Sequence, residues 1–242
     1  MATTTDEPDG GRVPPRTASD AVVAHLEDLI FDHTYGPGDS LPSESELSAE
    51  LGISRLTVRE GVRSLAARGL VEVSHGRRPV VAGPNATQLR DFFSSTVRRD
   101  ARGLLELLEV RLAIEVHAAE LAARNATQPQ IDSLAAALRA MTDAKDDDTF
   151  TAADMRFHHG ITAASGNHMI SLIVEGMAEP LKVGRLQSLR GYQQGHPDLG
   201  DLLDEHRRIL EAIAAHDPAG AARAMRRHLA TTRRDLLRAF ST

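Results

Sequence analysis

Apolar residues between positions 86 and 240 recur every three or four residues, and no stretch shows the alternation typical of strands. This spacing is typical of amphipathic helices, whose inner face repeats every 3.6 residues. Polar segments with Gly, Asn, Asp and Pro separate the apolar runs and supply helix caps. The pattern predicts helices near 86–99, 103–124, 128–145, 149–165, 168–190, 198–216 and 218–240. We therefore predict an antiparallel, all-α helical bundle over residues 103–242.

The first part of the chain, residues 17–82, has shorter apolar runs. A helix is predicted over 19–33, a second begins after Ser43, and a third begins after Ser54. Ser43 and Glu46 have the spacing of a capping box, in which each side chain satisfies a backbone N–H group of the other residue. A glycine between the second and third helices provides the turn of a helix-turn-helix.

Two short strands are expected after the third helix, at 70–73 and 79–82. The tip between them, Ser74-His-Gly-Arg-Arg78, contains a glycine and is basic, as expected for a hairpin. Helix, turn, helix and hairpin together predict a winged helix-turn-helix. The predicted fold class is therefore mainly α, with this unit preceding the helical bundle.

Charge is distributed unevenly along the chain. The net charge of −6 does not favour a DNA-binding protein, because phosphate neutralisation supplies most non-specific affinity. Residues 55–78, however, contain six arginines and two glutamates. Arg55, Arg59 and Arg63 recur every four residues on the outer face of the third helix, where they could donate hydrogen bonds to guanine. A solvated charged face is the simpler alternative for an isolated helix, but the turn and hairpin favour DNA binding.

Two segments, Leu41-Pro-Ser-Glu-Ser-Glu-Leu47 and Ser54-Arg-Leu-Thr-Val-Arg-Glu60, resemble the GntR family of bacterial transcription regulators. The resemblance implies homodimers that bind two-fold symmetric, double-stranded operators. It also implies that Ser54 begins the recognition helix. The residues that match DNA-contacting positions of the family are Arg55, Thr57, Arg59, His75 and Gly76. We add Arg63 and Arg77 to this set because of their predicted facing and their positive charge.

One departure from the family pattern lies on the second helix. Ser45 stands where the family usually has an arginine that reaches DNA. Operator affinity or sequence preference is therefore expected to differ.

A second group of polar residues lies on apolar helix faces in the bundle: Asp154, His158, His206 and His228. A buried carboxylate needs a partner, and no obvious cation accompanies Asp154 in the sequence. A single inward histidine is more often a satisfied core residue than a ligand. The four together favour a divalent metal ion, with zinc preferred and nickel, manganese or iron also fitting. The chain has no cysteine, so nitrogen and oxygen must hold the ion.

Asp154-Met-Arg-Phe-His158 and the two later histidines resemble the FCD domain, the ligand-binding half of FadR-type GntR regulators. That resemblance implies that Arg111 binds the carboxylate of an effector, with Glu115 orienting it. The alternative is an i, i+4 pair of Arg111 and Glu115, which would contribute only about 0.2–0.5 kcal/mol.

We therefore expect a DNA-binding transcription regulator, acting as a repressor, whose operator binding is controlled by a small organic acid at the metal site. One alternative makes the metal ion itself the signal. Another is a metal-dependent hydrolase, since such a site can activate water. No nucleophile or general base accompanies the site, so we do not expect an enzyme.

The remaining segments complete the predicted organisation. Residues 1–16 are polar and rich in glycine and proline, and we expect a disordered tail. Residues 83–102 are expected to form a linker and a connecting helix. No signal peptide or membrane span is recognisable, so a cytoplasmic protein without membrane contact is expected.

Overall fold

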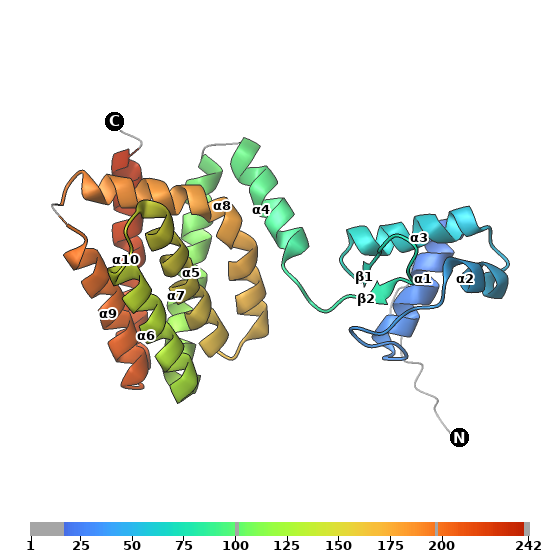
Figure 1. Cartoon of the computed structure of the whole chain (residues 1–242), viewed down its shortest axis with the longest axis horizontal. Helices are drawn as coiled ribbons and strands as arrows, with labels where there is room; N and C mark the ends of the chain where they lie inside the picture. Colours follow the sequence, from blue (N-terminus) through green and yellow to red (C-terminus); the bar gives the residue numbers. More distant parts are fainter. Residues whose placement is uncertain (1–16, 100–101, 197, 240–242) are drawn as a thin grey trace, which may run out of the picture. The chain divides into compact units, whose positions relative to one another are not determined.

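The computed structural model describes residues 17–99, 102–196 and 198–239. Residues 1–16, where we predicted a disordered tail, lie outside the described residues. The chain divides into two compact units, one ending at Asn85 and the other beginning at Ala86 (Figure 1).

Among its described residues, 17–85, the first unit contains three helices and a two-stranded antiparallel sheet. In chain order the elements are α1 (Ala18–Phe31), α2 (Glu44–Leu51), α3 (Arg55–Ala67), β1 (Val71–Glu72) and β2 (Val80–Val81). Val71 pairs with Val81 in the sheet. Apolar side chains from all five elements form one core: Val22, Leu26, Leu41, Leu47, Val58, Val62, Leu65, Val71 and Val81. This is the predicted winged helix-turn-helix.

Local sequence explains where these helices begin and how closely they pack. Ser43 and Glu46 form the predicted capping box at the start of α2. Gly52, with φ +66°, takes the left-handed conformation that the turn before α3 requires. Gly61 lies where α3 crosses α1, and a Cβ atom there would lie 2.8 Å from the side chain of Val22. These features set the position of α3.

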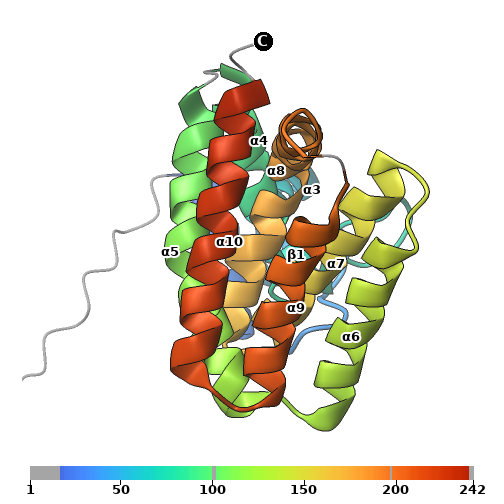
Figure 2. The ribbon, with the colours of Figure 1, turned by 90° about the vertical axis from the view of Figure 1, so that its left-hand side faces the viewer.

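The second unit consists of seven helices among its described residues: α4 (Thr87–Arg99), α5 (Arg102–Asn125), α6 (Gln128–Thr142), α7 (Asp147–Ala164), α8 (His168–Gln193), α9 (Gly200–Ala214) and α10 (Pro218–Ala239). Their bounds lie close to the predicted helices. In Figure 2, α5, α10, α9 and α6 stand side by side, and successive helices run in opposite directions. Helix α4 belongs to this unit and packs against α8. The fold class predicted from the sequence is confirmed.

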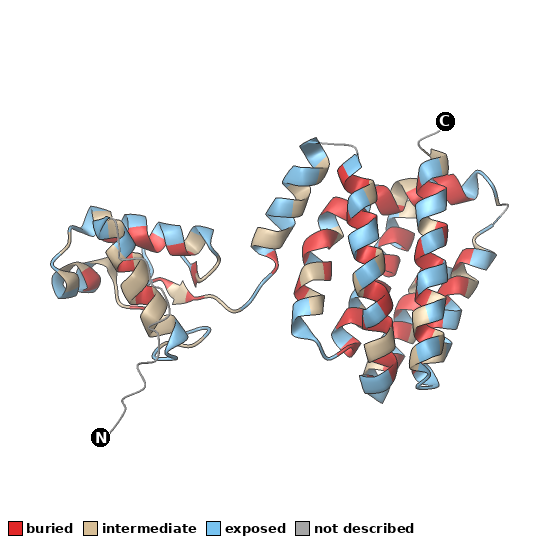
Figure 3. Cartoon of the chain, turned by 180° about the vertical axis from the view of Figure 1, so that it is seen from behind, coloured by how far each residue is buried: buried red, intermediate tan, exposed pale blue. Residues whose placement is uncertain are grey.

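The core of the bundle contains small residues where helices approach closely and larger apolar residues elsewhere. Ala118, Ala119 and Ala122 on α5 are fully buried, as are Phe157 on α7 and Ile209 on α9. Figure 3 shows buried segments alternating with exposed ones along the helices of the bundle. Several charged residues of the bundle are also buried. No described helix is long and apolar enough to cross a membrane.

Candidate metal centre and nucleic-acid interface

The four predicted metal ligands come from three helices and meet inside the bundle. Asp154 and His158 lie one turn apart on α7, His206 lies on α9 and His228 on α10. All four are buried, and one ligand atom from each lies within 4.8 Å of the others. Helix packing therefore brings together residues that are far apart in the sequence.

Each of the three histidines has a fixed partner for its Nδ1 atom. The Nδ1 distances are 2.5 Å from His158 to Glu115 Oε2, 2.8 Å from His206 to the carbonyl oxygen of Leu202, and 3.3 Å from His228 to Glu205 Oε2. Carboxylates and carbonyls accept hydrogen bonds, so in the neutral ring each Nδ1 carries the hydrogen. The three Nε2 atoms are left with lone pairs.

These Nε2 lone pairs point at one another and at Asp154. The Nε2 atoms of His206 and His158 lie 2.9 and 3.4 Å from Asp154 Oδ1, and the Nε2 atoms of His158 and His228 lie 3.3 Å apart. Burial lowers the pKa of His228 well below its usual value, so protonation of that ring is unfavourable. Four buried acceptors without a donor between them are unstable alone and fit a divalent cation.

Asp154 has a cationic partner, contrary to our expectation. Arg185 on α8 donates a hydrogen bond to Asp154 Oδ2, which leaves Oδ1 facing the histidines. Burial raises the pKa of Asp154, but Arg185 and His158 outweigh it and hold the pKa well below its usual value. The sequence reasoning missed Arg185, although its spacing from Leu181 and Leu189 places it on the apolar face of α8.

Glu115 connects the cluster to Arg111. Its Oε1 atom accepts a hydrogen bond of 2.6 Å from Arg111 Nε, and its Oε2 faces His158. The i, i+4 pair of Arg111 and Glu115 is therefore present, and it is buried, because both residues are only 1% exposed. Burial would raise the pKa of Glu115, but Arg111 and His158 together lower it. Arg111 Nη2 is buried and has no partner among the described residues.

The predicted DNA-contacting residues lie on α3 and on the hairpin of the first unit. Ser54 caps α3, where its Oγ accepts a hydrogen bond from the backbone N–H of Thr57. Five of them line one hollow of about 550 Å³ between the start of α2, the face of α3 and the hairpin tip: Arg59, Arg63, His75, Gly76 and Arg77. Recognition helix and hairpin thus present one basic surface.

Acidic and polar residues of α2 hold part of this basic surface. Arg59 makes a bidentate pair with Glu44, with distances of 2.7 to 3.0 Å. Arg55 donates a hydrogen bond to Ser45, the residue that departs from the family pattern. The sequence reasoning missed these contacts, since they join residues on different helices. Both arginines remain exposed.

Comparisons with known proteins find a matching family model in each of the two units of the chain. Residues 18–81 match the gntR family of bacterial regulatory proteins, and residues 106–231 match the FCD domain. The chain belongs to the GntR family and carries an FCD domain. This makes it a DNA-binding transcription regulator, because regulation of transcription through the helix-turn-helix is what the family and the relatives share.

Two relatives and two solved structures illustrate the similarity. The chain is 32% identical to the HTH-type transcriptional regulator Rv0494 of Mycobacterium tuberculosis, covering 92% of this chain and 88% of the relative. It is 31% identical to the HTH-type transcriptional repressor NanR of Escherichia coli K12, covering 87% and 81%. The structure of Streptococcus agalactiae GntR covers 89% of this chain and 99% of its own, at 28% identity and a TM-score of 0.64. Escherichia coli McbR/YncC, at 18% identity and a TM-score of 0.51, shares the fold.

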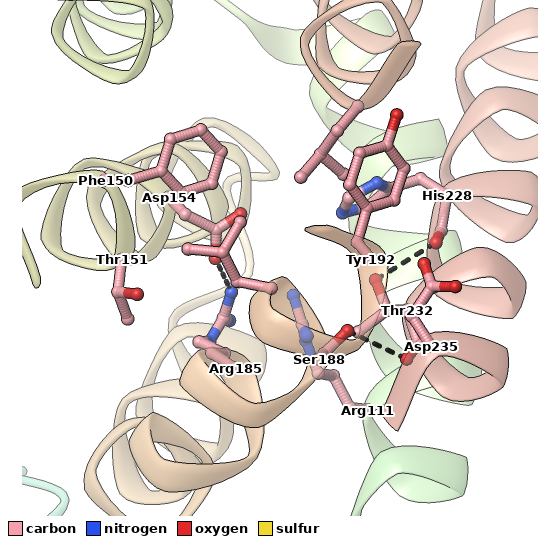
Figure 4. A pocket seen from close by; sticks show the side chains of 12 residues that line it. Arg111, Phe150, Thr151, Asp154, Arg185, Ser188, Tyr192, His228, Thr232 and Asp235 are labelled. Carbon is pink, nitrogen blue, oxygen red and sulfur yellow. Dashed lines mark hydrogen bonds and ion pairs between the residues drawn. The ribbon is translucent and has the colours of Figure 1, made fainter. Parts of the chain in front are cut away.

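A small cavity lies beside the histidine cluster of this GntR regulator (Figure 4). Its volume is about 30 Å³. The cavity is lined by Arg111, Phe150, Thr151, Asp154, Arg185, Ser188, Leu189, Tyr192, Leu202, His228, Thr232 and Asp235. We refer to it as the central cavity. Apart from Arg111, Asp154 and His228, the sequence reasoning singled out none of these residues as functional.

A larger groove of about 780 Å³ lies over α7 and α8 of the GntR regulator. It reaches the cluster from another side, because Glu115, His158 and Arg185 line it. Arg185 therefore borders both the groove and the central cavity.

Proposed function

We propose that this GntR regulator is a repressor that binds a divalent metal ion through Asp154, His158, His206 and His228, and that a small organic acid bound beside the ion controls operator binding. The observation that carries this proposal is the set of four buried acceptor atoms within 4.8 Å of one another. A cation stabilises this arrangement, and nothing in a simple hydrophobic core requires it.

The donor set indicates which ions fit. Three imidazole nitrogens and one carboxylate oxygen suit zinc first, and nickel, manganese or iron also. When bound, the ion supplies positive charge and open coordination positions for an oxygen ligand. Glu115, Glu205 and the carbonyl of Leu202 hold the three imidazole rings in the required tautomer.

The neighbouring arginines favour a carboxylate as the second ligand. Arg111 Nη2 and Arg185 Nε are buried and have no hydrogen-bond partner among the described residues. Both residues line the central cavity. Unpaired buried donors cost free energy, and a carboxylate would satisfy them with charge-assisted hydrogen bonds.

DNA binding would use the basic face of the first unit in a homodimer. We propose that Ser54, Arg55, Thr57, Arg59, Arg63, His75, Gly76 and Arg77 contact the operator. A dimer of such units reads two half-sites about one helical turn apart, or a multiple of it, so the operator should be two-fold symmetric. Such a protein would act in the cytoplasm, where its operator is found.

The effector can control DNA binding only if it binds the DNA-competent conformation of the regulator and the DNA-incompetent conformation with different affinities. We propose that the acid rearranges helices of the FCD domain and so changes the spacing of the two recognition helices in the dimer.

The test is a thermal-shift screen of metal-reloaded protein against simple carboxylates, hydroxy acids, sugar acids and amino acids. A specific ligand at about 100 times its Kd should stabilise the protein by about 2.7 kcal/mol. Arg111→Ala should lose this shift. The acid identified should then change the affinity of the wild-type protein for labelled operator, and an acid that binds without any effect on DNA would contradict the proposal.

A second candidate function makes the metal ion the signal. The small size of the central cavity, about 30 Å³, favours it, because this volume holds about one water molecule. In that case the ion alone, at physiological concentration and without any organic acid, should change operator affinity.

A further inference from the structure

One large apolar side chain on α3 has no packing role in the first unit. Leu56, the second residue of α3, is 65% exposed, the highest value among the large apolar side chains of the described residues. Helix α3 meets the core through Val58, Val62 and Leu65, and Leu56 takes no part in that cluster. The stability of the unit therefore does not explain a leucine at this position.

Helical geometry places Leu56 on the face of α3 opposite the core. Leu65, which is fully buried, lies about 2.5 turns of helix further along, so the two side chains point in opposite directions. Arg63 lies about two turns beyond Leu56 and therefore points the same way. Arg59 and Glu60, its neighbours on the next turn, are both exposed. Leu56 thus lies near the centre of the outer face of α3.

The arginines nearest to Leu56 are held on the side of α3 that faces α2. Glu44 accepts hydrogen bonds from Arg59, and Ser45 accepts one from Arg55. Leu56 has no polar side-chain atom that could join these contacts, and it does not line the hollow between α2, α3 and the hairpin. The outer face of α3 therefore presents an apolar side chain beside a row of hydrogen-bond donors.

The edges of the bases offer little for such a side chain to contact. In the major groove each base pair presents hydrogen-bond donors and acceptors, and the apolar group there is the C5-methyl of thymine. A leucine placed against a polar base edge would remove water without replacing its hydrogen bonds. Against a thymine methyl group, both partners bury apolar surface. The residues at the start of a recognition helix are those that contact base edges, and Leu56 is one of them.

We propose that Leu56 reads the methyl group of one thymine in each operator half-site and so selects a T·A pair at that position. This inference rests on the proposed function, because it takes α3 to be the helix that enters the major groove. Arg59 and Arg63 can donate hydrogen bonds to guanine but cannot recognise a methyl group. Leu56 therefore adds a base preference that the basic residues do not supply.

The experiment removes the methyl group from the DNA and leaves every hydrogen-bonding atom in place. An operator is selected from random duplexes with the full-length protein, and each thymine of one half-site is replaced in turn by deoxyuridine. Fluorescence anisotropy then measures the affinity for each duplex. One replacement should weaken binding by about fourfold, the factor expected for one buried methyl group. The other replacements in the same half-site serve as internal controls.

Variants at position 56 assign the effect to the leucine. Leu56→Ala should bind the thymine operator more weakly than the wild type does and should bind the thymine and deoxyuridine duplexes equally. Leu56→Met, which keeps an apolar side chain of similar length, should retain the preference for thymine. Phe31→Ala is the matched control, since Phe31 is 61% exposed at the end of α1 and lies on neither α3 nor the hairpin. This variant should behave like the wild type on both duplexes.

Two results would overturn the inference: a wild-type protein that is indifferent to every deoxyuridine replacement, or a preference for thymine that persists unchanged in Leu56→Ala. Arg63→Ala separates this failure from that of the proposed function. If Arg63→Ala weakens operator binding and deoxyuridine does not, only the leucine contact fails. If substitutions of Arg59, Arg63 and Leu56 all leave operator affinity unchanged, the proposed use of α3 fails and the leucine contact fails with it.

Discussion

Glu115 contacts both a proposed metal ligand, His158, and the proposed effector-binding residue, Arg111. One of its oxygens accepts a hydrogen bond from Arg111 and the other faces Nδ1 of His158. The same carboxylate thus orients a proposed metal ligand and a proposed effector-binding arginine. Its position on α5, buried between both partners, makes it more sensitive to substitution than an exposed acid of the same helix.

Glu115→Gln should weaken metal binding by about 10–100-fold, the usual effect of losing a group that orients a metal ligand. The amide can accept from only one of the two donors and places its own N–H₂ group against the other. Competition with a chromogenic chelator measures the affinity. Glu120→Gln, on the same helix but paired at the surface with Arg124, is the matched control and should bind metal like the wild type. Equal affinity in both variants would refute the orienting role.

Asp235 gives a prediction about stability and pH. Burial raises the pKa of this carboxyl group, so the folded protein holds the proton more tightly than the unfolded chain. The ionised form therefore costs stability, and this cost grows as pH rises above the ordinary value of 3.8. Its pairing with Arg238, which is 40% exposed, offsets little of the cost.

Asp235→Asn should accordingly melt at a higher temperature than the wild type at pH 7, and the difference should shrink as pH falls toward 4. Circular dichroism melts across this range measure it. Asp204→Asn is the control: the Asp204 side chain is 44% exposed and pairs with Arg207 at the surface, so this variant should change the melting temperature little at any pH. A variant that is less stable at neutral pH would show that the Arg238 contact outweighs the burial of the charge.

At the scale of the elements, residues of α2 contact the arginines of α3 that we propose to bind DNA. Glu44 of α2 holds the guanidinium of Arg59, and Ser45 holds that of Arg55. These contacts position the arginines along the outer face of the recognition helix, while Val58, Val62 and Leu65 fix the opposite face to the core.

Arg59→Ala should lower operator affinity by about 1–3 kcal/mol, the range for a side chain that contacts a base edge. Fluorescence anisotropy with a labelled operator selected from random duplexes measures this loss. Arg68→Ala is a suitable control, because Arg68 follows the same helix, is exposed and pairs with Glu27 of α1 outside the predicted surface. If both variants lose affinity equally, general electrostatic attraction would explain the binding without a specific contact.

At the scale of the whole molecule, the two units have separate cores, and the candidate metal site belongs to the second alone. Removing the metal should therefore lower the melting temperature of the FCD domain and leave the transition of the DNA-binding unit unchanged. An ion present at about 1,000 times its Kd stabilises the unit that binds it by about 4.1 kcal/mol.

Differential scanning calorimetry with and without a chelator tests this expectation. His206→Ala should melt at the same temperature in both conditions, because the variant lacks one ligand of the site. A chelator that leaves the wild-type melting curve unchanged would argue against a structural metal at the cluster.

The sequence by itself determined the elements of this protein, their order and their inward faces. Helix periodicity and capping are local, so the capping box of Ser43 and Glu46 and the helices of the bundle could be predicted from neighbouring residues. Placing Asp154 and the three histidines on apolar faces was possible for the same reason. Their role as metal ligands, like that of the DNA-contacting residues, stays a prediction.

Only the tertiary structure decided which polar residues meet. Arg185 pairs with Asp154 across 31 positions of the sequence, and Glu115 faces His158 across 43. Such contacts depend on how whole helices pack, and periodicity specifies that a residue points inward without specifying its partner. The tautomers of the histidines and the unpaired donors of Arg111 and Arg185 follow from that packing.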